Sequence, residues 1–73
     1  MSAVSAALRI TVNGAAVESP QGLSVEQLLA HLKLPAGRVA VERNRDIVRR
    51  GVRDRVLVQE GDVFEIVTFV GGG

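Results

Sequence analysis

The chain has 73 residues, of which 47% are hydrophobic, and its formal net charge is +1 at pH 7. This length suffices for one small domain and excludes a second one. The absence of cysteine excludes disulfides, a thiol nucleophile and thiolate metal ligands, and it favours a cytoplasmic protein. Residues 1–7 are small and apolar but lack the basic start of a signal peptide, so we expect a loose leader and no membrane association.

The first two strands are predicted as a β-hairpin. Leu8–Val12 alternates between apolar and polar residues, the period of a half-buried strand. Asn13-Gly14 follows directly, and this pair favours a type I′ turn because both of its central positions need positive φ. Ala15–Glu18 should therefore return antiparallel to the first strand.

One amphipathic helix follows the hairpin. Ser24 and Gln27 have the spacing of a capping box, and Leu23 with Leu28 has the spacing of a hydrophobic staple. The pattern predicts a helix that ends before Pro35, because proline cannot continue it. Its apolar face comprises Val25, Leu28, Leu29 and Leu32.

The second half of the chain predicts short strands joined by turns. With the hairpin and the single helix, they indicate an α+β fold in which the helix covers one face of a mixed sheet. The expected segments are a strand at Arg38–Glu42, a turn at Asn44–Asp46 leading to Ile47 and Val48, an irregular segment at Arg49–Arg55, a brief strand at Val56–Val58, a turn at Glu60–Asp62 and a final strand at Val63–Val70.

The segment from Arg43 to Arg55 is locally basic, with six of the eight arginines of the chain. Glu42, Asp46 and Asp54 are interleaved with them and halve the local excess of positive charge. We interpret the segment first as a solvated face and second as a docking surface for an acidic partner. Because no tyrosine or tryptophan is available for base stacking, we predict no nucleic-acid binding.

The chain lacks the residue patterns of an enzyme active site. His31 is the only histidine and has no predicted nucleophile or carboxylate partner. Neither a glycine-rich phosphate loop nor a cluster of metal ligands is present, and Lys33 belongs to no such motif. We therefore predict no catalytic residue, no metal site and no bound cofactor.

The final strand leads into three glycines, and its alternation divides the apolar residues between two faces. One face should be buried with Phe64, Ile66, Thr68 and Val70, and the other carries Glu65, Val67 and Phe69. Val67 and Phe69 are therefore candidates for a docking patch, unless another element covers that face. Gly71, Gly72 and Gly73 form a flexible tail that could be threaded into another protein.

The run Gly61–Gly73, GDVFEIVTFVGGG, together with Val39–Asn44 and the Asn13-Gly14 turn, resembles the ThiS family of sulfur carriers in the thiamine pathway. The resemblance extends from Leu8 to Gly73. It implies a ubiquitin-like β-grasp domain over residues 8–70 with a tail at 71–73. Two features depart from the family, namely the long leader and Arg49-Arg50, where a Pro-Arg pair is common.

The resemblance also implies a mechanism and partners. A ubiquitin-activating-type adenylyltransferase, using ATP and magnesium, would adenylate the carboxylate of Gly73, which then becomes a thiocarboxylate. The sulfur would come from a cysteine persulfide on a cysteine desulfurase or a rhodanese-like protein, and thiazole synthase would receive it. Gly71 and Gly72 would pass through the narrow channel of the adenylyltransferase. The chain itself would be a protein co-substrate and not an enzyme.

Three alternatives stay open from the sequence. The small subunit of molybdopterin synthase and the carrier of cysteine synthesis also end in Gly-Gly, although the former typically has prolines where Phe69-Val70 stands here. The run Leu57–Thr68 is also similar to the N-terminal β-grasp module of threonyl-tRNA synthetases. Those modules continue into further domains and need no terminal glycines, so the ending at Gly73 favours a carrier.

Overall fold

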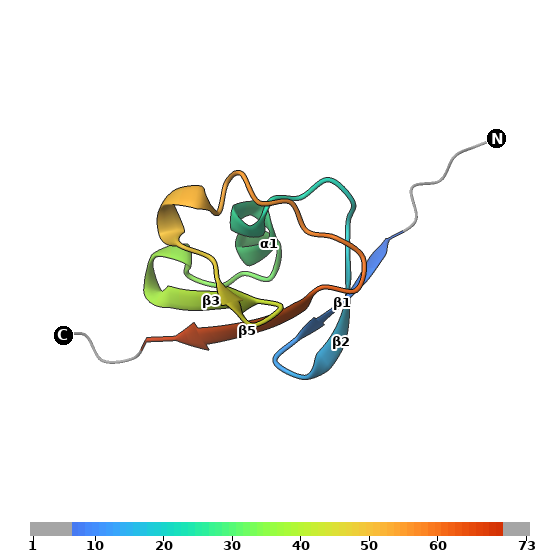
Figure 1. Ribbon diagram of the computed structural model, residues 1–73, viewed down its shortest axis with the longest axis horizontal. Helices are drawn as coiled ribbons and strands as arrows, with labels where there is room; N and C mark the ends of the chain where they lie inside the picture. Colours follow the sequence, from blue (N-terminus) through green and yellow to red (C-terminus); the bar gives the residue numbers. More distant parts are fainter. Residues whose placement is uncertain (1–6, 70–73) are drawn as a thin grey trace.

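The computed structural model describes residues 7–69, which form a mixed five-stranded sheet with one α-helix packed on one of its faces (Figure 1). The strand order is β2-β1-β5-β3-β4, so the last strand in the sequence lies at the centre of the sheet. The predicted α+β class is confirmed. The elements are β1 (Leu8–Val12), β2 (Ala15–Ser19), α1 (Val25–His31), the 3₁₀ helix η1 (Ala36–Arg38), β3 (Val39–Arg43), β4 (Asp46–Ile47), the 3₁₀ helix η2 (Arg50–Val52) and β5 (Val63–Thr68).

The hairpin has the predicted turn. Strands β1 and β2 pair antiparallel up to Val12 and Ala15, and the two turn residues Asn13 and Gly14 have φ values of 50° and 84°. Positive φ at both positions is the signature of a type I′ turn, which matches the twist of the flanking strands. The Asn-Gly pair therefore fixes the register of the hairpin locally.

Helix α1 begins as the capping pattern predicts. The Ser24 hydroxyl accepts a hydrogen bond from the backbone N–H of Gln27 at 3.1 Å, and the Gln27 side chain accepts one from the Ser24 N–H at 2.9 Å. Val25, Leu28 and Leu29 are fully buried. Leu32, the C-cap residue after the helix ends at His31, packs against the same core. The predicted apolar face is therefore confirmed.

The core lies between α1 and the adjacent face of the sheet. Phe64 from the central strand is the only aromatic side chain in it, and it is fully buried. The buried apolar residues are Ile10, Val25, Leu28, Leu29, Val39, Val41, Val48, Val58, Phe64 and Ile66. Phe64 and Ile66 thus occupy the face that the alternation of the final strand assigned to them.

Three boundaries differ from the sequence prediction because they depend on pairing with distant residues. Strand β3 begins at Val39 and includes Arg43, which pairs with Phe64 of β5. The apolar stretch Val56–Val58 forms no strand, and Leu57 makes an isolated bridge to Ser24. Strand β5 ends at Thr68, which is exposed, and Val70 lies outside the described residues.

The interpretation of the basic segment as a solvated face is wrong for Arg53, which is buried with 3% of its surface exposed. Its guanidinium donates from Nη1 to the Ala36 carbonyl at 3.0 Å and from Nη2 to the Val39 carbonyl at 2.8 Å. Arg50 makes a similar bond from Nη2 to the Gly37 carbonyl at 2.7 Å. These donors satisfy carbonyl groups where η1 meets β3, since a buried carbonyl without a partner is costly.

Candidate functional site

The predicted tail follows a strand that neighbours hold on both sides. On one side β5 pairs antiparallel with β3, and beyond the ladder the Phe69 N–H donates to the Arg38 carbonyl at 2.7 Å. On the other side β5 pairs parallel with β1 through Val12 and Phe64. Val70 and the predicted tail residues Gly71, Gly72 and Gly73 lie outside the described residues. The described chain therefore leads to the tail from a fixed position at the centre of the sheet.

A side-chain amide extends the pairing between β1 and β5. Asn13 donates from Nδ2 to the Ile66 carbonyl at 2.9 Å, and its Oδ1 accepts from the Ile66 N–H at 2.7 Å. The Asn13 amide thus provides one donor and one acceptor to Ile66, as the backbone of a neighbouring strand does in a β-sheet. The parallel pairing has only two residue pairs, so Asn13 adds a third contact closer to the end of β5.

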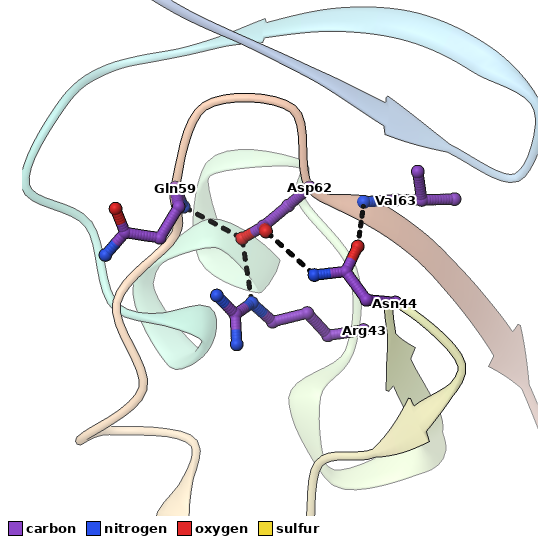
Figure 2. Close-up of polar contacts among 5 residues, drawn as sticks. All are labelled: Arg43, Asn44, Gln59, Asp62 and Val63. Carbon is purple, nitrogen blue, oxygen red and sulfur yellow. Dashed lines mark hydrogen bonds and ion pairs between the residues drawn. The ribbon is translucent and has the colours of Figure 1, made fainter.

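The start of β5 is fixed by the buried carboxylate of Asp62 (Figure 2). It accepts hydrogen bonds from Arg43 Nε at 2.8 Å, Asn44 Nδ2 at 3.0 Å and the Gln59 N–H at 2.8 Å. Asn44 Oδ1 in turn accepts the N–H of Val63, the first residue of β5, at 2.9 Å. This network joins the turn before β5 to the end of β3.

The hydrogen bonds also set the acidity of Asp62. Burial by itself raises the pKa of this carboxyl, because it disfavours the charged form. The bonds from Arg43, the Gln59 backbone and Asn44, with the positive charge of Arg43, outweigh burial and hold the pKa of Asp62 below its ordinary value. The sequence predicts Asp62 only as a turn residue, and no local pattern in it indicates this network.

The face of β5 turned away from α1 is uncovered. Val67 and Phe69 expose 60% and 56% of their surfaces, and Glu65 is exposed beside them. In Figure 1, α1 and the loops lie on the opposite side of the β3–β5 part of the sheet. The sequence left open whether another element covers Val67 and Phe69. Within the described residues none does, and both side chains are exposed.

Among the residues that the structure describes, no catalytic constellation accompanies His31. It is exposed in the last turn of α1 and lines a pocket of about 430 Å³ with Ala7, Glu18, Ser19, Pro20 and Gln21. Across residues 7–69 there is no group of three histidine, cysteine or acidic residues that could hold a metal ion. Within the same range, no helix is long and apolar enough to cross a membrane.

Comparisons with solved structures identify the fold. The crystal structure of the thiamine biosynthesis protein ThiS from Geobacter metallireducens is 38% identical to this chain with a TM-score of 0.76, covering 90% of this chain and 100% of that one. The N-terminal ubiquitin-like domain of the 4931431F19Rik protein has a TM-score of 0.58 at 16% identity, a likeness of fold alone. The predicted ubiquitin-like β-grasp fold is confirmed.

The chain is similar to short sulfur carrier proteins and to one segment of much longer thiazole synthases. The sulfur carrier protein ThiS of Bacillus subtilis is 42% identical over 50 residues, which are 68% of this chain and 76% of that protein. A thiazole synthase of Magnetococcus marinus is 41% identical over 66 residues, which are 90% of this chain. The chain spans only 20% of the length of that thiazole synthase. The family model of ThiS matches residues 4–73, and the chain therefore belongs to the ThiS family.

Proposed function

We propose that this chain is a sulfur carrier of thiamine biosynthesis, which acts as a protein co-substrate and not as an enzyme. The observation that carries the proposal is the ThiS family match, which includes the three glycines that follow the central strand. The name of the Bacillus subtilis relative, sulfur carrier protein ThiS, supports the same role. The match also favours the thiamine pathway over the related carriers of molybdopterin and cysteine synthesis.

The first chemical step is activation of the Gly73 carboxylate. One of its oxygens attacks the α-phosphorus of ATP on a ubiquitin-activating-type adenylyltransferase, and pyrophosphate leaves. Magnesium bound with the ATP neutralises the phosphate charge. A carboxylate is a poor electrophile, and the adenylate gives it AMP as a leaving group. The step requires Gly73 to be the C-terminal residue, because only a free carboxylate can be adenylated.

Sulfur then replaces the AMP. The terminal sulfur of a cysteine persulfide, on a cysteine desulfurase or a rhodanese-like protein, attacks the acyl carbon, and AMP leaves with the bonding electron pair. This gives an acyl persulfide that joins the carrier to the donor. A second thiol of the delivery machinery attacks the donor cysteine sulfur, which forms a disulfide and releases the Gly73 thiocarboxylate.

Thiazole synthase is the proposed acceptor of this sulfur. The support is that proteins named thiazole synthase contain a segment about 40% identical to nearly all of this chain. A carrier and a synthase that share one polypeptide in some organisms are expected to contact each other when they are separate chains. We place the protein in the cytoplasm, with residues 1–7 as a leader outside the domain of residues 8–70.

The tail and the uncovered face have separate roles in this proposal. Gly71 and Gly72 pass through the channel to the nucleotide, where a side chain at either position would clash. Val67 and Phe69 dock against the partner, since exposed apolar residues gathered on one face often mark an interaction site. Docking by the sheet and threading by the tail together place Gly73 at the nucleotide.

The test of the proposal is AMP formation by the cognate adenylyltransferase with ATP, magnesium and this protein. Wild-type protein should support AMP formation, and Gly72→Val should abolish it without changing the circular dichroism spectrum or the melting temperature. Gly51→Val is the matched control, because a Cβ at Gly51 meets no atom within 4 Å and Gly51 lies in η2, outside the strands that lead to the tail. Equal AMP formation by wild type and Gly72→Val would contradict the threading role.

A further inference from the structure

The register of β3 and β5 arranges the uncovered face in rows. Residues directly opposite each other on paired strands point to the same side of the sheet. Glu42 lies opposite Glu65, and two residues closer to the tail Ala40 lies opposite Val67. Phe69 follows beyond Val67. The face therefore presents a row of two carboxylates, then a row of two apolar side chains, then the exit of the tail.

The carboxylate row is electrostatically unfavourable in the isolated protein. Like charges at directly opposed positions of two strands destabilise a sheet. Within residues 7–69 the one ion pair joins Arg43 to Asp62, and neither Glu42 nor Glu65 makes a side-chain hydrogen bond. On the edge strand β4, the residue paired with Glu42 is Ile47, which is 74% exposed and carries no charge.

Within residues 7–69, no basic side chain forms an ion pair or a hydrogen bond with Glu42 or Glu65. On the β1 side the parallel pairing ends at Val12 opposite Phe64, and the side chain of the following residue, Asn13, is bound to the backbone of Ile66. On the β4 side Ile47 separates Glu42 from the solvent edge. The negative charge of the row is thus left for a group from another molecule.

We propose that Glu42 and Glu65 receive a basic side chain of the adenylyltransferase that activates Gly73, while Ala40, Val67 and Phe69 take the apolar surface beside it. The inference rests on the proposed function. Side chains at opposed positions have Cβ atoms about 5 Å apart. One arginine guanidinium can therefore bridge both carboxylates, with charge-assisted hydrogen bonds on each side.

The position of the row relative to the tail supports this partner. Gly73 lies eight positions after Glu65, and an extended chain of that length reaches at most about 30 Å. An enzyme that encloses the Gly73 carboxylate must therefore lie close to the exit of β5. A cation that bridges the two glutamates would also remove their mutual repulsion, so part of the cost of the carboxylate row is recovered only in the complex.

The experiment compares the Michaelis constants of the carrier variants in AMP formation by the cognate adenylyltransferase. Glu42→Gln with Glu65→Gln should raise KM about tenfold, which corresponds to about 1.4 kcal/mol, with kcat within about twofold of wild type. The same double variant should melt at a higher temperature than wild type, because the repulsion is gone. Raising the salt concentration should narrow the difference in KM.

The matched control is Glu26→Gln with Asp54→Asn, which changes the net charge equally but lies on α1 and in the segment after η2. Its KM should equal that of wild type. A wild-type KM for Glu42→Gln with Glu65→Gln, or an equal rise in the control, would overturn the inference. If wild-type protein itself supports no AMP formation by an active enzyme, the proposed function fails, and the inference falls with it.

Discussion

At the scale of single residues, Asp62 has the largest consequences for the fold. Asp62 is 4% exposed, and its carboxylate accepts bonds from the side chains of Arg43 and Asn44 and from the backbone of Gln59. Through Asn44 it also reaches the first N–H of β5. A single buried acid therefore sets where the central strand begins relative to β3.

Replacing this acid should weaken the fold in a way that depends on pH. Asp62→Asn leaves the Arg43 guanidinium beside an amide, and we expect a loss of about 2 kcal/mol in the free energy of unfolding at neutral pH. Because the folded-state pKa of Asp62 is lowered, its contribution is complete above the ordinary pKa of about 3.9 and is lost as the pH falls through the folded value.

Urea titrations at neutral and at acidic pH measure this effect. The difference between wild type and Asp62→Asn should shrink as the pH falls below the ordinary pKa of an aspartate, because the folded-state pKa of Asp62 is lowered. Asp54→Asn is the control, since Asp54 is exposed, and its effect should stay within about 0.5 kcal/mol. A difference between wild type and Asp62→Asn that does not change with pH would show that charge is not the basis of the network.

At the scale of elements, β5 depends on a short parallel pairing that the Asn13 side chain extends. The two bonds between Asn13 and Ile66 lie beyond the last backbone pair of β1 and β5. They come from a turn residue whose positive φ of 50° is itself needed for the hairpin. The turn thus serves two elements, the hairpin through its backbone and the central strand through its side chain.

Asn13→Gly separates these two roles, because glycine keeps the positive φ and removes the side chain. We expect a loss of about 1–2 kcal/mol in unfolding free energy and faster hydrogen exchange at the Ile66 amide, which loses its acceptor. Arg45→Gly, at another exposed turn position with positive φ, is the control for the flexibility of an added glycine. Unchanged protection of the Ile66 amide in Asn13→Gly would contradict the role of the side chain.

The elements also show which features the sequence could predict. The hairpin turn and the start of α1 were predictable because Asn13-Gly14 and the Ser24 capping box act over at most three residues. The roles of Arg53 and Asp62 were not, since apart from the Gln59 N–H their partners lie 14 to 19 positions away, at Val39, Ala36, Asn44 and Arg43. The same dependence on distant pairing explains the shifted start of β3 and the missing strand at Val56–Val58.

At the scale of the whole molecule, the two faces of the sheet have different surroundings. One side of the sheet packs with α1 into an aliphatic core around Phe64, and the other side is left open along β3 and β5. The central strand carries both the open face and the approach to the glycine tail. The alternation of β5 placed Val67 and Phe69 on the face opposite Phe64, but that this face is exposed, and that Glu42 lies opposite Glu65, required the folded structure.

The central claim is that Gly73 carries sulfur, and the intact mass of the protein tests it most directly. The protein is incubated with the cognate adenylyltransferase, ATP, magnesium and a persulfide donor, and the mass is measured before and after. We expect a gain equal to the exchange of one oxygen for one sulfur, located on Gly73 by fragmentation and absent in Gly72→Val. An unchanged mass, with an adenylyltransferase and a donor that are demonstrably active, would contradict the account.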